Sequence, residues 1–115
     1  TNMLSCDRSW QIEYFSEEVR LEIATLPVGI RAGYARLTEL LEEFGLELRM
    51  PHSRAMGNGL FELRPHGKEG IARVFYCTLV GRRIVILHSF VKKTHETPKR
   101  ELELARKRQQ EISKQ

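Results

Sequence analysis

The sequence predicts one small α+β domain, in which two N-terminal helices and a C-terminal helix pack on a mainly antiparallel sheet. The chain has 115 residues, which is the length of a single domain. Apolar residues recur at helical spacing over residues 30–44, and two long apolar runs follow at residues 71–80 and 84–91. A composition with 41% hydrophobic residues is sufficient for a core. We therefore expect a loose lead-in at residues 1–9 and one domain over residues 10–115.

The N-terminal part of this domain is predicted to contain a strand and two helices. Residues 10–14 alternate apolar and polar, which is typical of a half-buried strand. Ser16 is a suitable N-cap for a helix that ends near Pro27. Gly45 is placed to end a second helix. The apolar stripe of that second helix consists of Ile30, Tyr34, Leu37, Leu41 and Phe44.

Beyond Gly45 the pattern changes from helical to extended. We expect a short or edge strand at residues 46–50, interrupted by a proline, and a loop at residues 53–59. A strand at residues 60–64 and the two long apolar runs are joined by short turns, which predicts an antiparallel meander with the long runs at its centre. Thr97 and Pro98 together mark the start of a final, strongly basic helix.

Charge is distributed unevenly along the chain. The net charge is +4, but residues 1–48 carry four Lys or Arg against nine Asp or Glu, a net −5. Residues 49–115 carry fifteen against six, a net +9, and they also hold all four histidines. A field of this sign favours a polyanionic partner such as a nucleic-acid backbone. The alternative is a solvated basic surface without a partner.

The remaining composition excludes several other classes of protein. Cys6 and Cys77 are far apart, and Cys77 lies in an apolar run, so we expect a buried thiol in a reducing compartment. No run of about 20 apolar residues occurs, and no basic segment precedes an apolar one at the N-terminus. We therefore expect a cytoplasmic protein without membrane contact. The histidines lack paired spacing and Asp7 is the only aspartate, so we expect no metal site and no cofactor.

The candidate site residues are cations attached to the predicted sheet. Arg73 lies within an apolar strand, and a buried guanidinium needs either an anion or a structural carboxylate such as Glu62 across the meander. Arg64 ends the preceding strand. His66 and Lys68 follow in a turn, where they could add an imidazole and a further cation to a catalytic site or, as the alternative that we favour, simply be solvated.

A second candidate group follows the last predicted strand. Lys92 and Lys93 are flanked by Phe90 and His95, just before the final helix. Cations at such a place can hold a phosphate backbone while an aromatic ring stacks on a base. His88 has apolar neighbours and is expected to be a buried or half-buried structural histidine.

The order of these motifs resembles the RelE/HigB superfamily of bacterial toxins, in particular its phage-derived HigB-like branch. The resemblance covers about residues 10–112 and rests on the segments 60–64, 72–76, 86–94 and 97–106. It implies a RelE-like fold and a ribosome-dependent mRNA endonuclease, or mRNA interferase, that inhibits translation as the toxin of a type II toxin–antitoxin system. The implied partners are the ribosome, mRNA and a cognate antitoxin. Such an antitoxin usually has a helix-turn-helix domain, so contact with DNA would be indirect.

The resemblance also implies roles for individual residues. Arg64 and Arg73 correspond to the sheet arginines that grip phosphate, and Lys92 and Lys93 to the basic pair at the end of the last strand. The side chains expected to contact RNA around them are His66, Lys68, Phe90 and His95. Better-known relatives have a tyrosine in the C-terminal region, whereas the last tyrosine here is Tyr76. The general base therefore stays open, with His66 and His95 as candidates.

The implied reaction is RNA cleavage without metal, in which the ribose 2′-hydroxyl attacks the adjacent phosphate. It leaves a cyclic or 3′-phosphate and a 5′-hydroxyl. Preorganised cations would stabilise the charge that develops on the phosphorane oxygens. The alternative function is a non-catalytic basic module that binds RNA or an acidic partner.

Overall fold

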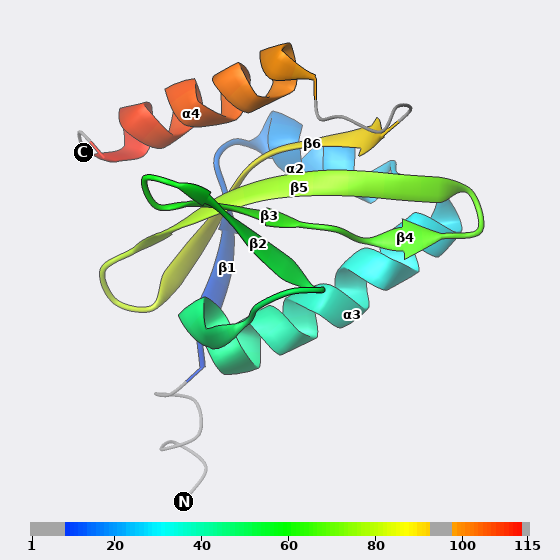
Figure 1. The fold of residues 1–115 in the computed structure, drawn as a ribbon, viewed down its shortest axis with the longest axis horizontal. Helices are drawn as coiled ribbons and strands as arrows, with labels where there is room; N and C mark the ends of the chain where they lie inside the picture. Colours follow the sequence, from blue (N-terminus) through cyan, green and yellow to red (C-terminus); the bar gives the residue numbers. More distant parts are fainter. Residues whose placement is uncertain (1–8, 93–97, 114–115) are drawn as a thin grey trace, which may run out of the picture.

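The computed structural model describes residues 9–92 and 98–113, and Cys6, Lys93, His95 and Thr97 lie outside them. Within this part the α+β prediction is confirmed (Figure 1). The helices are α2 (Glu17–Ala24), α3 (Val28–Phe44), a 3₁₀ turn η1 (Gly45–Glu47) and α4 (Lys99–Ser113). The strands are β1 (Gln11–Tyr14), β2 (Ser53–Gly57), β3 (Leu60–Leu63), β4 (His66–Gly67), β5 (Gly70–Leu79) and β6 (Arg83–Lys92). None of these helices has both the length and the apolar composition needed to cross a membrane.

One sheet contains all the described strands, in the order β1-β6-β5-β3-β2, with β4 paired to the start of β5. The two long apolar runs, β5 and β6, are its central strands, as predicted. Neighbouring strands are antiparallel except that β1 runs parallel to β6. The meander β3-β5-β6 therefore places β3 beside β5, and Arg64, predicted as the end of this strand, follows its last residue.

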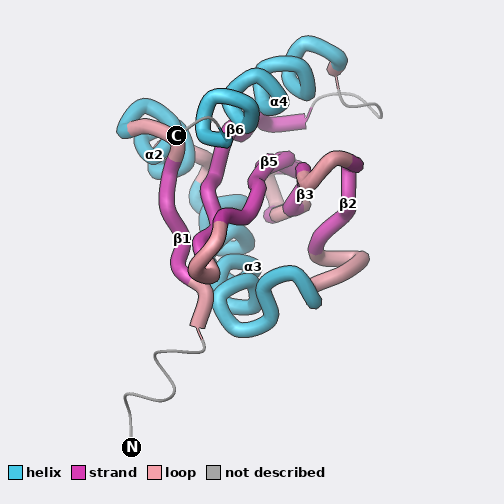
Figure 2. Tube along the Cα trace, turned by 90° about the vertical axis from the view of Figure 1, so that its left-hand side faces the viewer, coloured by secondary structure: helices cyan, strands magenta, loops and turns pink. Residues whose placement is uncertain are grey.

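Helices α2 and α3 cover one face of the sheet and α4 covers the other (Figure 2). Successive strand residues point to opposite faces, so alternate residues of each strand enter different cores. The core under α2 and α3 contains Val19, Ile30, Tyr34 and Leu41 from the helices, and Leu63, Ala72, Val74, Tyr76, Ile84 and Ile86 from the sheet. The core under α4 contains Ala105 with Leu60, Phe75, Cys77, Val85 and Leu87. Cys77 is buried, as predicted.

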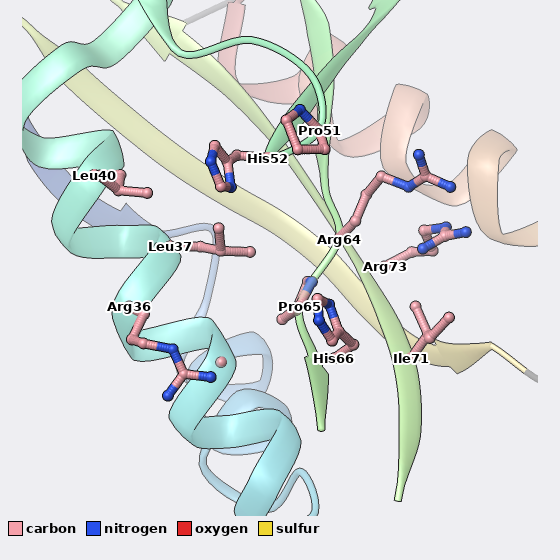
Figure 3. A pocket seen from close by; sticks show the side chains of 11 residues that line it. Arg36, Leu37, Leu40, Pro51, His52, Arg64, Pro65, His66, Ile71 and Arg73 are labelled. Atoms are coloured by element: carbon pink, nitrogen blue, oxygen red, sulfur yellow. The ribbon is translucent and has the colours of Figure 1, made fainter. Parts of the chain in front are cut away.

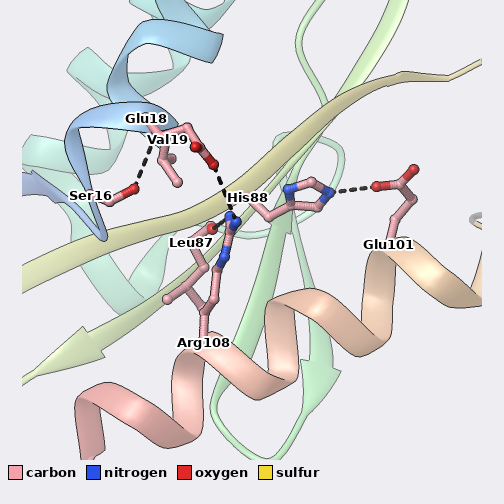
Figure 4. Close-up of polar contacts among 7 residues, drawn as sticks. All are labelled: Ser16, Glu18, Val19, Leu87, His88, Glu101 and Arg108. Atoms are coloured by element: carbon pink, nitrogen blue, oxygen red, sulfur yellow. Dashed lines mark hydrogen bonds and ion pairs between the residues drawn. The ribbon is translucent and has the colours of Figure 1, made fainter.

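Arginines of α4 fix this helix to the sheet. Arg106 donates hydrogen bonds to the carbonyls of Met56 and Gly57 at the end of β2. Arg108 donates to the carbonyl of Leu87 (Figure 4), and its guanidinium lies 5.3 Å from the centre of the Phe15 ring. Part of the positive charge of α4 is therefore used in packing.

Local contacts explain where the N-terminal helices begin and end. Ser16 caps α2 by accepting a hydrogen bond from the backbone N–H of Val19, and Gly45 ends α3 with a φ of 55°, both as predicted. The start of α3 has no cap of its own. Instead the carboxylate of Glu69, from the β4–β5 turn, accepts a 2.9 Å hydrogen bond from the N–H of Gly29. This contact ties α3 to the turn that follows β4.

Two predictions about residues 46–70 are wrong, and a third is right only in part. Residues 46–50 alternate like a strand, but they form η1 and irregular backbone, because no neighbouring strand pairs with them and Leu46 and Met50 are exposed. Ser53–Gly57, predicted as a loop, is the edge strand β2; edge strands need little apolar alternation, and only Ser53 in it is buried. The turn predicted at residues 65–70 is present but shorter, because residues 66–67 form the short strand β4 and only residues 68–69 make the turn.

Candidate functional site

The predicted cations on β5 and β6 come together on the face of the sheet that α4 only partly covers. Arg73 pairs with Phe90, and Ile71 pairs with Lys92, in the antiparallel register of these strands. Directly paired residues of adjacent strands project from the same face. Arg73, Phe90 and Lys92 therefore share one face.

A bulge in β6 makes this arrangement possible. Tyr76 pairs with Ile86 but Phe75 pairs with His88, so Leu87 is an extra residue in β6. Without the extra residue, strict alternation would place Phe90 and Lys92 on the same side as Ile86, against α2 and α3. The bulge reverses which face of the sheet each later residue of β6 points to. Phe90 and Lys92 therefore project toward the α4 side.

Glu62 is the centre on which the two predicted arginines converge. Its Oε1 lies 3.6 Å from Nε of Arg73 and 3.9 Å from Nε of Arg64. The exposed fractions are 1% for Glu62 and 3% for Arg73, whereas Arg64 keeps 32% of its side chain exposed. The expected alternative partner of Arg73 is thus confirmed, and one buried carboxylate holds both guanidinium groups. Nη1 of Arg73 has no hydrogen-bond partner among the described residues.

Arg54 is a fourth cation of this cluster, and it was missed at the sequence level because its strand was interpreted as a loop. It lies on β2 opposite Glu62 and is exposed. Burial lowers the pKa of Arg73; Glu62 opposes this effect, and Arg64 and Arg54 add to it. We call Arg54, Arg64, Arg73, Lys92 and Glu62 the cationic cluster. Four cations and one carboxylate give it a formal charge of +3.

Lys92 experiences the field of all the other members of the cationic cluster. Its pKa lies below the ordinary value of 10.5, first because of desolvation and then because of repulsion by Arg73 and Arg64. Arg54 adds a smaller repulsion, and Glu62 acts in the opposite direction. A bound phosphate would relieve this repulsion, so the cluster is suited to an anion.

Aromatic side chains lie beside the cationic cluster. The half-buried Phe90 ring stacks against Phe75 and against His88, with both centroid distances 6.1 Å. His88 is 7% exposed, and its Nε2 is hydrogen-bonded to Glu101 at the start of α4 (Figure 4). The prediction of a structural histidine is confirmed. A role of Phe90 in stacking on a base stays a prediction.

The remaining predicted residues are placed less centrally. His66 is exposed on β4, opposite Ile71. Lys68 lies at the exposed tip of the β4–β5 turn; there the backbone N–H of Gly29 is the main cause of the lowered pKa of Glu69, and Lys68 adds to it. Lys93 and His95 lie outside the described residues, so their roles stay predictions. In the described part, no three His, Cys, Asp or Glu side chains gather as metal ligands.

A pocket of about 480 Å³ adjoins the cationic cluster (Figure 3). It extends from α3 across the segment that links β3 to β4. Its lining residues are Gly33, Arg36, Leu37, Leu40, Pro51, His52, Arg64, Pro65, His66, Ile71 and Arg73. The pocket thus shares two arginines with the cluster, and His52 and Arg36 were not among the predicted site residues.

The fold and the cluster together define a small α+β domain whose sheet presents cations on one open face. The sequence profile of the phage-derived Gp49-like proteins matches residues 21–110, and the chain belongs to this family. The match begins in α2 and ends in α4, so it includes every described member of the cationic cluster. No curated protein matches the chain.

Proposed function

We propose that the protein is the toxin of a type II toxin–antitoxin system and acts as a ribosome-dependent mRNA endonuclease of the RelE/HigB type. Membership of the Gp49-like family, which is associated with toxin–antitoxin systems, supports the toxin class. The observation that carries the nuclease proposal is the convergence of Arg64 and Arg73 on Glu62, with Lys92 on the same face. The proposed partners are the ribosome, mRNA and an antitoxin with a helix-turn-helix domain, all in the cytoplasm.

The chemistry proposed for the cluster is stabilisation of a pentacoordinate phosphate. The 2′-oxygen forms a bond to phosphorus, the 2′-proton passes to a base, and the 5′-oxygen leaves and takes up a proton. Negative charge grows on the phosphorane oxygens, and fixed cations stabilise it more than they stabilise the ground state. Glu62 fixes the guanidinium groups before RNA arrives, so little reorganisation is needed.

The members of the cluster contribute differently because their exposure differs. Arg64 and Lys92 are partly exposed and are the groups that contact phosphate. Arg73 is nearly buried and supplies its charge from beneath them. The lowered pKa of Lys92 also makes this ammonium a better proton donor and its amine more available as a base than an ordinary lysine.

The proposal is tested by inducing the full chain in growing cells and mapping cuts in translated mRNA by primer extension. We expect growth arrest and cleavage with the native chain, and loss of both with Arg64→Ala or Lys92→Ala. Lys107→Ala, which removes an exposed cation of α4 far along the chain from the cluster, is the matched control and should remain toxic. Circular dichroism checks that each variant is folded. If Arg64→Ala and Lys92→Ala both cleaved mRNA like the native chain, the cluster would not be the catalytic site.

The second candidate is a non-catalytic module that binds RNA or an acidic partner. The burial of Arg73 against Glu62 favours it, because a buried arginine that is paired with a carboxylate has a structural role and does not reach a substrate. In that case the native chain binds RNA in a salt-dependent manner. It then produces no translation-dependent cuts.

A further inference from the structure

The pocket beside the cationic cluster differs from the cluster in its chemistry. In Figure 3, Leu37 and Leu40 of α3 lie on one side of the segment that carries Pro65, and Arg64 and Arg73 point away from α3 on the other side. The pocket therefore connects an apolar wall on α3 with the cationic face of the sheet. An RNA strand bound along the cationic cluster could cross the segment that carries Pro65 and stay in contact with the protein surface in the pocket.

The lining combines three kinds of group. Leu37 and Leu40 are apolar, His52 and His66 offer imidazole rings, and Arg36 adds a guanidinium. No carboxylate lines the pocket in the part of the chain that the structure describes. Apolar walls, imidazole faces and a guanidinium plane are the groups on which unpaired nucleobases stack in proteins that bind single-stranded RNA. The lack of carboxylates suits a ligand that also carries a phosphate.

The pocket is held open between two rigidly packed elements. A Cβ added to Gly33 on α3 would lie 2.7 Å from the carbonyl oxygen of His66, so helix and β4 are in backbone contact below the pocket. The volume of about 480 Å³ falls in the usual range for sites that bind small organic groups, about 300–1,000 Å³. A nucleoside therefore fits a space that exists before binding.

We propose that this pocket is a nucleoside subsite, which takes one base of the RNA next to the phosphate bound by the cationic cluster. The inference rests on the proposed function and deepens it, because it assigns Arg36, Leu37, Leu40 and His52 to substrate recognition. The base packs against the leucines and an imidazole, and the adjoining phosphate faces Arg64. A site of this kind selects among bases by shape, so it contributes to the choice of cleavage position.

Binding is tested with the purified, nitrogen-15-labelled full chain and the four ribonucleoside 5′-monophosphates as probes. We expect amide shifts at Leu37, Leu40 and His52 with at least one nucleotide. Inorganic phosphate, which has no base, should shift only residues of the cationic cluster. If phosphate and the nucleotides gave the same shifts, or if no nucleotide perturbed the α3 side of the pocket, the subsite would be disproved.

Variants separate the pocket from the cluster. His52→Ala removes an exposed ring, and Leu40→Glu replaces part of the apolar wall with a carboxylate where the base would pack; each should raise the nucleotide Kd about fivefold or more. The matched control is Val80→Glu, which adds the same charge at a 95% exposed position after β5. It should leave the Kd unchanged. If Leu40→Glu does not fold, the test uses His52→Ala and Arg36→Ala instead. A nucleotide Kd that is unchanged in both variants overturns the proposal.

Cleavage mapping distinguishes failure of the subsite from failure of the proposed function. With both correct, His52→Ala still cuts translated mRNA but at an altered set of positions, whereas Lys92→Ala does not cut. An unaltered cut pattern in His52→Ala, beside an active native chain, overturns the subsite alone. A native chain that binds nucleotides in the pocket but cuts nothing overturns the nuclease and keeps the subsite.

Discussion

The two faces of the sheet are built from the same strands and yet have different roles. On the face under α2 and α3, Leu63 and Val74 are fully buried in an apolar core. Their sequence neighbours Glu62 and Arg73 project to the other face and form the centre of a charged cluster. Along each strand, a residue that packs in the apolar core is therefore followed or preceded directly by a residue of the charged cluster. The packed face can hold the backbone in place while the open face keeps charged groups close together.

The sharpest way to test this comparison is to alter the neighbours Glu62 and Leu63 separately. Leu63→Ala removes buried apolar volume and should lower the free energy of unfolding by about 2–5 kcal/mol. Glu62→Gln leaves Arg73 buried without its carboxylate and should cost about 3–5 kcal/mol. Urea denaturation measures both. Cleavage per folded molecule should fall only in Glu62→Gln, because only that change frees the arginines.

The double variant Glu62→Gln/Arg73→Met gives the control for Glu62→Gln. Removing both buried charges should recover much of the stability lost in the single variant, since the remaining cost is no longer that of an unpaired ion. Stability equal to the sum of two independent losses would mean that the pair is not coupled. The positions of the charged side chains would then depend on the apolar core and not on the Glu62–Arg73 pair.

A second prediction concerns what Lys92 contributes to the open face. Lys92→Arg keeps a positive charge but cannot release a proton near neutral pH. If the lowered pKa of Lys92 serves proton exchange, Lys92→Arg should lose cleavage about as strongly as Lys92→Ala, by roughly 100-fold. If the Lys92 amine is the base, the native rate should also rise with pH, because the amine becomes more populated as pH approaches the pKa of Lys92. Primer extension on mRNA translated at several pH values measures this, and near-native cleavage by Lys92→Arg would restrict the lysine to phosphate binding.

A third prediction tests whether the packed face sets the position of β4 and its histidine. Gly33→Ala brings a methyl group against the backbone of His66 and should destabilise the fold by about 1–3 kcal/mol. Ala35→Ser, at an exposed position of the same helix, should change stability by no more than about 0.5 kcal/mol. Urea denaturation compares the two variants. Equal stability of both would show that α3 and β4 can separate freely.

The smallest expected effect concerns Cys77, in the core under α4. Burial raises the pKa of its thiol from 9.0 to about 11. The neutral thiol is thus favoured in the folded chain. Its contribution to the free energy of unfolding is fully present below about pH 9 and is lost as pH rises toward about 11. In a Cys6→Ser background, alkylation by iodoacetamide near neutral pH should be about 100-fold slower in the folded chain than in urea. Equal rates would mean that α4 does not close this part of the sheet.

Periodicity predicted the elements that bury a continuous surface. The stripe from Ile30 to Phe44 gives α3, and the two long apolar runs give β5 and β6, because both central strands are covered on two faces. β2 was missed because an edge strand is mostly solvated and has no pattern that separates it from a loop. The parallel pairing of β1 with β6 depends on contacts far apart in the sequence, which alternation does not encode.

The candidate site was predictable only in part, for the same reason. Arg64 and Arg73 were identified from their places in strands, and Glu62 was recognised as a possible partner of Arg73. Arg54 was not predicted as a site residue, because its strand β2 was interpreted as a loop. The bulge at Leu87, which brings Lys92 to the face of Arg73, was not predicted, because the continuous apolar run of residues 84–87 does not show where an extra residue is inserted.

The extent of the open face follows from the difference between two lengths. A strand of ten residues such as β5 spans about 33 Å, whereas the fifteen residues of α4 span only about 22 Å. In Figure 1 the start of β5 and the end of β6 reach beyond the first turn of the helix. Strand β5 is thus roughly 11 Å longer than α4, and among the described elements no helix covers the start of β5 on this face. One further helical turn of about 5.4 Å would offset about half of this difference, so the length of α4 sets how much of the cationic face of the sheet stays uncovered.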